Sequence, residues 1–434
     1  MDALKREIGT VRKAFEVLDD GDKLPVDYQK IDCHVVWDVK FGSLKRKVRL
    51  VALGNRTETP TAQTYASVVS RDSVRIALTI AALNELDVMQ ADIEGAYLNS
   101  PCDEKIWTVL GEEFGPELRG KRAVVKRALY GLKSAAASHR NHLASGLKHL
   151  GFESCKADPD IWMRAAVKTK GGVTVDIYEY ILVYTDDLLV IGCEPRTLLQ
   201  RIDKYFHLKP DSVGEPDIYL GAKIRRVQCG DMMAWSQSSA GYVRDAVKDV
   251  ETWCAQNGFR IPVKCKIPMS STYRPELDVS EALSSEYASW YRSSIGTLRW
   301  ACELGRVDLT TETSMLASHM MQPRVGHLMA LLQVFGYLKS HHNARLVHDP
   351  RYPNVDQSMF TKADWTSFYG DVKELIPPNA PEPRGAPVVI TAWVDADHAG
   401  EKLTRRSRSG FLFYVNSSLI LFKSKKQPTV QGAT

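Results

Sequence analysis

The sequence has no cysteine pair with the C-x-x-C spacing used by zinc sites and redox motifs, although it contains 8 cysteines. It also has no secretory signal peptide, so a disulfide framework is not expected and the thiols should be reduced. No apolar run approaches the ~20 residues of a membrane-spanning helix. We therefore expect an intracellular protein, in the cytoplasm or the nucleus, without a membrane partner.

Internal repeats and low-complexity tracts are also missing, and the composition is unlike that of a disordered or collagen-like chain. Hydrophobic residues make up 44% of the chain and charged residues 25%, as in globular proteins. Because 434 residues are too many for one ordinary core, we expect about two to four domains.

The net charge of +5 is a mild basic excess, which fits a nucleic-acid partner but also fits many metabolic enzymes. Two basic clusters are more informative than the total. They consist of Lys40, Lys45, Arg46, Lys47 and Arg49, and of Arg405, Arg406 and Arg408. Either cluster can neutralise phosphates, and the alternative for each is a solvated loop.

Apolar residues recur at helical spacing in four stretches of the first half, which predicts four helices. These cover residues 3–18, 73–86, 134–150 and 197–206. Short apolar or alternating runs predict strands between them. The strands cover residues 33–39, 48–52, 88–91, 123–125, 173–183, 188–191 and 218–227, and the first two form a hairpin with a basic turn around Gly42 and Ser43. This order is that of an antiparallel sheet backed by helices.

The second half changes in composition along its length. Residues 282–340 have helical spacing throughout, in two or three segments, whereas residues 351–388 are rich in proline and predict a linker. A strand-rich stretch begins near residue 388 and continues to residue 434.

The tetrapeptide Tyr184-Thr185-Asp186-Asp187 lies between two apolar strands, so its two carboxylates project from a hairpin turn. Adjacent anions repel each other, and a divalent metal removes that cost. Magnesium takes hard oxygen ligands and usually only one or two protein carboxylates. The alternative interpretation is an ordinary hairpin turn, because aspartate favours turns.

Asp92 provides a third carboxylate, since it follows the apolar strand predicted over residues 88–91. If this strand is a neighbour of the hairpin, the three carboxylates meet at one edge of the sheet. Two magnesium ions roughly 3.5–4 Å apart can then stabilise the attacking and leaving oxygens of a phosphoryl transfer. An aspartate at a strand end is common by itself, so the surrounding sequence decides between these interpretations.

That surrounding sequence resembles copia-type (pseudovirus) LTR retrotransposon reverse transcriptases from about residue 30 to the end, with the blocks in the family's order. Three blocks form the centre: Asp-Ile-Glu-Gly-Ala-Tyr-Leu-Asn at 92–99, Ala-Leu-Tyr-Gly-Leu-Lys at 128–133 and Tyr-Thr-Asp-Asp at 184–187. Further similar blocks lie at residues 47–52, 65–70, 219–221, 294–298 and 336–339. Many blocks in order are more specific than any single motif.

The resemblance implies an α+β fold of the right-hand polymerase type, with an antiparallel palm sheet backed by helices. The implied parts are an N-terminal helix and lead-in (1–29), fingers and palm (30–230), a mostly helical thumb and connection (231–350), a proline-rich linker (351–388) and an incomplete RNase H-like α/β unit (389–434).

The resemblance also implies roles for the carboxylates and for one tyrosine. Asp92 and Asp186 are the expected principal metal ligands, with Asp187 as the supporting carboxylate, for two Mg²⁺ ions or Mn²⁺ in their place. Tyr97 is expected under the sugar of the incoming nucleotide, where its ring blocks a 2′-hydroxyl. The alternative for Tyr97 is a packed core aromatic.

The expected nucleotide-binding residues besides Tyr97 are Lys47, Arg49, Lys133 and Ser134. Lys47 and Arg49 are expected to hold the triphosphate, and the alternative is the solvent face of a strand. The family commonly has Gln-Ala-Pro-Arg after the second block, where this sequence has Ser-Ala-Ala-Ala at 134–137. The glutamine contacts the nucleotide, so its role is altered here, while Ser134 is expected to cap the following helix.

The resemblance implies roles for two further residues, Lys209 and Asp395. Lys209 is matched to a general acid near the departing pyrophosphate, against an exposed loop lysine. Asp395, in Trp-Val-Asp-Ala-Asp-His-Ala-Gly at 393–400, resembles the first carboxylate of the family's RNase H site. The remaining carboxylates of that site are expected beyond Gln427, so no RNase H activity is expected. With no integrase, protease or gag-like segment before the polymerase, the sequence is expected to be an excised piece, a truncated gene or a decayed copy.

The implied reaction is RNA-directed DNA polymerisation, in which a primer 3′-hydroxyl is extended with deoxynucleoside triphosphates on an RNA or DNA template. The nucleic acid should be held through phosphates and helix shape. One alternative is a catalytically silent, truncated relic that only binds nucleic acid. Another is an unrelated metal phosphotransferase, which requires the block order to be accidental.

Overall fold

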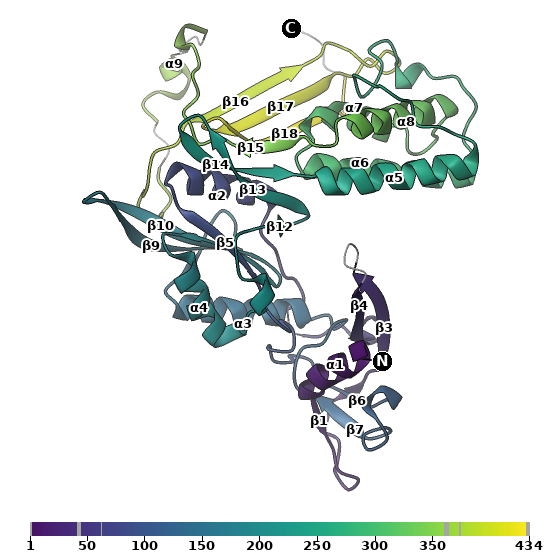
Figure 1. The fold of residues 1–434 in the computed structure, drawn as a ribbon, viewed down its shortest axis with the longest axis vertical. Coiled ribbons are helices and arrows are strands. Elements are labelled where there is room, and N and C mark those ends of the chain that lie inside the picture. Colours follow the sequence, from purple (N-terminus) through teal and green to yellow (C-terminus); the bar gives the residue numbers. More distant parts are fainter. Residues whose placement is uncertain (1, 41–44, 62, 360–363, 373–374, 431–434) are drawn as a thin grey trace. The chain divides into compact units, whose positions relative to one another are not determined.

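The computed structural model describes all residues except 1, 41–44, 62, 360–363, 373–374 and 431–434. The fold is α+β and forms two compact units, each built from discontinuous segments of the chain (Figure 1). The first unit comprises Met1–Ser70, Asp87–Ala165 and Glu179–Glu215, and the second comprises Arg71–Leu86, Ala166–Tyr178 and Pro216–Thr434. The domain bounds expected from the sequence remain predictions.

The N-terminal helix is shorter than predicted. Helix α1 covers Asp2–Val11, a 3-10 turn follows, and strand β1 covers Phe15–Val17. The prediction of one helix over 3–18 was therefore wrong at its C-terminal end. Strand β1 pairs antiparallel with β7 (Arg122–Val125), and Phe15 packs edge-on against Phe114 with ring centres 5.4 Å apart. Cross-strand pairing thus overrides the helical spacing.

Two small sheets complete this part of the first unit. Strands β1 and β7 continue through β6 (Ile106–Val109) to β2 (Gln29–Lys30). The predicted hairpin is present as β3 (Cys33–Lys40) and β4 (Lys45–Ala52). Its turn at 41–44, with Gly42 and Ser43, lies outside the described residues.

The central sheet of the chain has five strands in the order β5-β11-β10-β9-β8. Their bounds are Asp87–Asp92, Asp187–Gly192, Val173–Tyr184, Ile161–Lys170 and Glu153–Ser154. Two helices back its first-unit part, α3 (Ala135–His149) and α4 (Pro195–Phe206). Their buried side chains, such as Leu147 and Ile202, share one core with strand residues such as Val190. The structure agrees here with the predicted antiparallel sheet backed by helices.

The strand predicted over residues 218–227 is in fact two strands. β12 (Ile218–Tyr219) and β13 (Ala222–Cys229) pair antiparallel with each other. The chain reverses between them because Leu220 and Gly221 both have positive φ, at 50° and 83°. The sheet continues through β14 (Met232–Ser238) to β15 (Arg345–His348).

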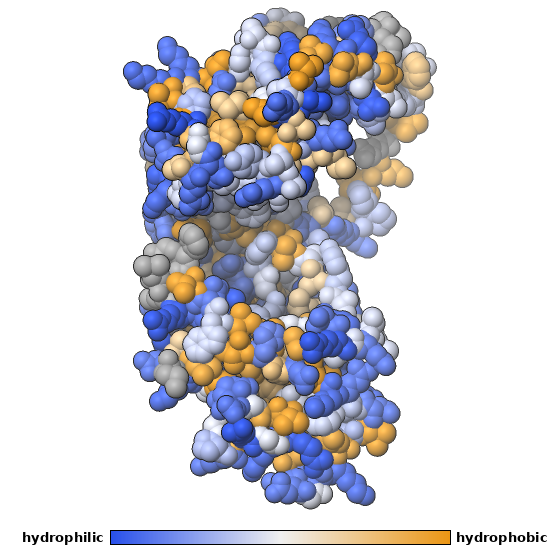
Figure 2. Space-filling view, turned by 90° about the vertical axis from the view of Figure 1, so that its right-hand side faces the viewer, coloured by the Kyte–Doolittle hydropathy of each residue, from blue (hydrophilic) through white to orange (hydrophobic). Residues whose placement is uncertain are grey.

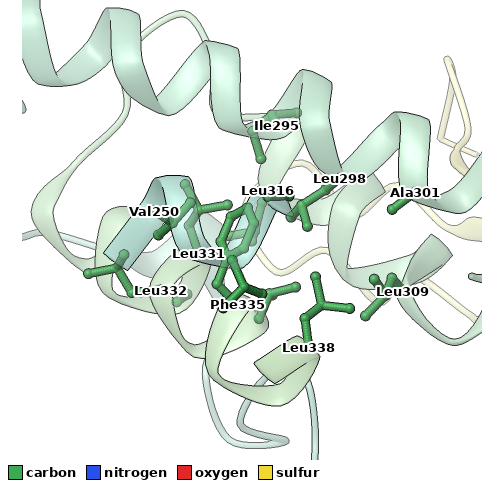
Figure 3. Packing of buried hydrophobic residues seen from close by; sticks show 14 of the residues in the cluster. Val250, Ile295, Leu298, Ala301, Leu309, Leu316, Leu331, Leu332, Phe335 and Leu338 are labelled. Carbon is green, nitrogen blue, oxygen red and sulfur yellow. The ribbon is translucent and has the colours of Figure 1, made fainter. Parts of the chain in front are cut away.

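Helices dominate the rest of the second unit, as predicted for residues 282–340. They are α2 (Arg71–Leu83), α5 (Ala240–Asn257), α6 (Ser285–Glu303), α7 (Thr310–Ala317) and α8 (Val325–Ser340). Figure 3 shows Phe335 of α8 among buried side chains of the other helices, including Leu298 and Leu316. This apolar core accounts for the helical spacing of the sequence.

The last elements form a separate antiparallel sheet, β16-β17-β18, which lies beside α7 (Figure 1). Its strands cover Ile390–Ala396, Arg408–Val415 and Ser418–Lys426. Between β15 and β16 the described residues contain only a 3-10 turn, Gln357–Met359, and the short helix α9, Thr366–Tyr369.

On the face drawn in Figure 2, hydrophobic residues lie in small groups among hydrophilic ones. Within the part of the chain that the structure describes, no helix has the length and apolar character needed to cross a bilayer.

Candidate carboxylate site

The hairpin turn between β10 and β11 carries two of the predicted site residues. Tyr184 and Asp187 are opposite each other in the ladder, which leaves Thr185 and Asp186 as the two turn residues. Thr185 has a φ of 58°, and a positive φ at the first turn position is the pattern of a type II′ hairpin turn. This conformation is uncommon for a β-branched residue, so the turn requires support from its surroundings.

Asp92 lies directly across from this turn. It is the antiparallel partner of Asp187, and the backbone N–H of Ile93 donates to the carbonyl of Asp186 at 2.9 Å. The strand that carries Asp92 is therefore a neighbour of the hairpin, as the sequence argument required. The structure brings Asp92, Asp186 and Asp187 together at one end of the sheet.

Lys209 forms an ion pair with the Asp92 carboxylate. The backbone N–H of Lys209 also donates to the Asp92 carbonyl at 2.9 Å, and the Ser212 hydroxyl accepts from the Asp92 N–H at 2.8 Å. The lysine lies in the loop after α4 and is partly exposed, as the loop interpretation expected. Its amine nevertheless belongs to the carboxylate site, which places a cation beside the expected metal ligand.

Tyr97 is half-buried between two other rings. Its ring centre is 5.0 Å from that of Tyr130 and 5.9 Å from that of His139, and both contacts are edge-on. Burial raises the pKa of its hydroxyl, and the nearby Tyr130 and Asp186 raise it further. Tyr97 is therefore a packed aromatic whose hydroxyl also senses the charge of Asp186.

His139 is a site residue that the sequence interpretation missed. It is 2% exposed, and its Nε2 lies 3.0 Å from the Thr185 carbonyl oxygen. Burial lowers its pKa, against smaller opposing effects of Thr185 and Asp186. A signal was available, because His139 lies four residues from Ala135 and from Leu143, on the apolar face of the predicted helix.

One of the two predicted cations of β4, Arg49, contacts this group of aromatic rings. The Arg49 guanidinium is 5.2 Å from the centre of the Tyr130 ring, which is within the range of a cation–π contact. Lys47 is exposed and lies two residues before Arg49 on the same strand. Glu7 of α1 accepts from the Leu50 N–H at 3.0 Å, and burial raises the pKa of its carboxyl despite the nearby Arg49 and Lys47.

The other two predicted nucleotide-binding residues are occupied by protein contacts. The Lys133 amine donates to the Thr57 carbonyl at 2.6 Å. Ser134 is 1% exposed, and both its N–H and its hydroxyl donate to one Glu104 oxygen, at 2.9 Å and 2.7 Å. The prediction that the Ser134 side chain caps α3 was wrong, because Glu104 engages its hydroxyl and it makes no capping hydrogen bond.

The carboxylates suit magnesium in chemistry and number. Asp92, Asp186 and Asp187 supply only hard oxygen donors, and magnesium needs no more than one or two of them from the protein. In the described ranges no three His, Cys, Asp or Glu side chains are placed to hold one metal ion together. A magnesium site in which substrate phosphates supply some of the ligands does not require three protein side chains around one ion.

Asp395 lies in the second unit, on the exposed strand β16 opposite Gly410 of β17. Its carboxylate accepts from the N–H of Ala396 at 2.8 Å. The carboxylates of the first unit and Asp395 are therefore carried by two different sheets.

Comparison with known protein families gives one match, which covers more than half of the chain. Residues 15–265 match the family described as "Reverse transcriptase (RNA-dependent DNA polymerase)". A retrovirus-related Pol polyprotein from transposon RE1 of Arabidopsis thaliana is 26% identical over 410 residues, which are 92% of this chain and 24% of that protein. A putative transposon Ty5-1 protein of Saccharomyces cerevisiae is 28% identical over 256 residues, which are 57% of this chain and 74% of that protein.

A third relative is the Pol polyprotein from transposon TNT 1-94 of Nicotiana tabacum, 22% identical over 456 residues, with 100% of this chain and 30% of that protein covered. The chain thus spans about a quarter of the length of the Arabidopsis relative. Among solved structures, a foamy viral protease-reverse transcriptase in complex with double-stranded DNA has a similar fold. Its TM-score is 0.50 at 11% identity, with 98% of this chain and 55% of that chain covered.

Proposed function

Because the chain belongs to the reverse transcriptase (RNA-dependent DNA polymerase) family, we propose that it is an RNA-directed DNA polymerase that extends a primer 3′-hydroxyl. The observation that carries the proposal is the pairing of Asp92 with Asp187, with Asp186 beside them in the hairpin turn. Three carboxylates at one sheet end are the donor set that a two-metal nucleotidyl transfer uses.

In this proposal Asp92 and Asp186 hold two Mg²⁺ ions, or Mn²⁺ in their place, and Asp187 supports them. When bound, the ions lower the pKa of the primer hydroxyl and stabilise the charge on the reacting phosphate. The pairing of β5 with β11 places the backbone of Asp92 beside that of Asp187 before substrate arrives. This preorganisation reduces the cost of aligning the two carboxylates during the reaction.

The remaining residues of the site act on the nucleotide. Arg49 and Lys47 neutralise the triphosphate, and the Tyr97 ring excludes a 2′-hydroxyl from the sugar position. Lys209 is the proposed proton donor to the departing pyrophosphate, since its amine already lies at the Asp92 carboxylate. We leave Ser134 out of the nucleotide pocket because its hydroxyl is buried on Glu104.

We assign the helices and strands to the parts of a polymerase as follows. The sheet containing β5, β11 and β10 is the palm, and the β3–β4 hairpin belongs to the fingers. Helices α5 to α8 form the thumb and connection, and β16 to β18 form an RNase H-like segment with Asp395. Template and primer bind mainly through their phosphates, so binding weakens steeply as salt rises. The double-stranded DNA in the foamy viral structure supports this choice of partner.

One assay tests the proposal. The purified chain receives a primed RNA template, deoxynucleotides and Mg²⁺, and Asp186→Asn serves as the matched control. We expect extension by the native chain and loss of extension in the variant. Extension by neither protein, or equal extension by both, contradicts the proposal.

A second candidate function is a catalytically silent protein that only binds nucleic acid. The observation that favours it is the burial of Ser134 at the position where the family commonly has a nucleotide-contacting glutamine. Under this alternative, a labelled primer–template binds with strong salt dependence while no extension occurs. The same preparation can be used for both measurements.

A further inference from the structure

We propose that His139 is a positioning residue that holds the catalytic turn, through a hydrogen bond from its imidazole to the Thr185 carbonyl. The inference rests on the proposed polymerase function for its catalytic consequence. Its structural part, the link between α3 and the turn, can be tested independently of any activity.

The turn needs an external restraint. Thr185 has a positive φ of 58°, a conformation that residues with a Cβ rarely adopt. Asp186 follows it directly, so any relaxation of the Thr185 peptide moves the first carboxylate of the pair. The His139 Nε2 lies 3.0 Å from the Thr185 carbonyl oxygen. Because His139 is only 2% exposed, water competes weakly for this hydrogen bond.

The contact with Thr185 requires a proton on Nε2 of His139. A carbonyl oxygen can only accept, so Nε2 of His139 must donate to Thr185. Nδ1 lies 3.4 Å from the Ser100 hydroxyl, which also donates to the Ala96 carbonyl at 3.2 Å.

The same ring also positions Tyr97. The two rings meet edge-on with centres 5.9 Å apart, and Tyr97 packs in turn against Tyr130. His139 itself is fixed by helix α3, whose next two residues on this face, Leu143 and Leu147, are buried in the core. One side chain therefore links a rigid helix to both the carboxylate turn and the sugar-facing ring.

A residue that merely fills space would behave differently from one that donates this hydrogen bond. His139→Phe keeps a ring against Tyr97 but cannot donate to Thr185. His139→Gln loses the ring but keeps an N–H at a similar reach. His142→Phe is the matched control on the same helix, since His142 contacts Phe206 rather than the turn.

The first measurement is amide hydrogen exchange of the peptide that spans residues 181–190, which requires no activity. We expect faster exchange in His139→Phe than in the native chain, partial recovery in His139→Gln, and native exchange in His142→Phe. Native exchange in His139→Phe would overturn the proposal.

The second measurement is single-nucleotide extension. We expect kcat to fall by about tenfold or more in His139→Phe, because small displacements of reacting groups are costly. KM for the nucleotide and Kd for primer–template should stay within about twofold. Equal losses in His139→Phe and His139→Gln would indicate a packing role only. If the native chain extends no primer, the polymerase proposal fails, while hydrogen exchange still decides the role of His139.

Discussion

The amine of Lys209 and the carboxylate of Asp92 form an ion pair that joins the loop after α4 to the end of β5. Both side chains are partly exposed, at 44% and 28%. Exposed pairs of this kind contribute about 0–1 kcal/mol to stability, so the contact adds little to the folded state. Because the ion pair includes the proposed metal ligand Asp92, we expect Lys209 to affect catalysis rather than stability.

We predict that Lys209→Met slows nucleotide incorporation by about a hundredfold, because a positioned general acid contributes on that scale. The midpoint of thermal unfolding should change little. Rapid-quench measurement of a single incorporation tests the rate, with Lys204→Met, an exposed lysine of α4, as the control. A native rate in Lys209→Met would show that the amine takes no part in proton transfer.

Tyr97 should determine the choice between deoxyribonucleotides and ribonucleotides. Tyr97→Val opens the space that the ring occupies, so we expect discrimination against CTP relative to dCTP to fall by about tenfold or more. The ratio of kcat/KM for the two nucleotides measures this. Tyr97→Phe keeps the ring and should retain discrimination, and a loss in that variant would assign selection to the hydroxyl.

Arg49 and Arg46 lie on opposite faces of β4, which allows a matched comparison of charge. Arg49 is stacked on Tyr130, whereas Arg46 is exposed and opposite Val39. We expect Arg49→Gln to raise KM for the deoxynucleotide by about tenfold, because the variant loses one charge contact to the triphosphate. Arg46→Gln should be nearly neutral. Equal effects would point to net charge rather than to a specific contact.

The second unit should lose stability in mild acid because of His348. This side chain is fully buried beside Ser418, and burial, with a smaller effect of Arg75, lowers its pKa to about 3. Between that value and the unfolded pKa of about 6.5, only the unfolded chain takes up the proton. The free energy of unfolding should therefore fall by about 1.4 kcal/mol for each pH unit below about 6.5 from this group alone.

Urea unfolding at a series of pH values measures this slope. His348→Leu should reduce the slope even if it lowers stability at every pH, whereas His398→Gln, at an exposed position, should leave it unchanged. An unchanged slope in His348→Leu would assign the acid sensitivity to other groups.

Much of the site was accessible from the sequence because local patterns encode it. The copia-type family was identified correctly, and the strands that carry Asp92 and Asp187 follow from short apolar runs. The sequence left open whether these two strands are neighbours, and the structure shows that they pair. The sequence identified the three carboxylates as candidate site residues, and their binding of metal ions remains a prediction.

The contacts that the sequence did not reveal connect distant segments. His139 meets Thr185 across 46 residues, and Lys209 meets Asp92 across 117. The helical spacing of residues 134–150 places His139 on a buried face, but no periodic pattern identifies Thr185 as its partner. The burial of Ser134 also involves a distant contact, since its partner Glu104 lies on a separate segment 30 residues earlier.

Helix α2 has a consequence for how the protein is made. Its buried Thr79 donates to the Ser418 hydroxyl at 2.8 Å, across 339 residues, and the helix packs against β14 and β18. At about 5–20 residues per second, a ribosome needs roughly 20–70 s to synthesise the intervening chain. During that interval Arg75 and Thr79 of α2 lack their native partners on β18, Ile420 and Ser418. Nascent chains should therefore depend on chaperones that protect this helix until the C-terminal sheet emerges.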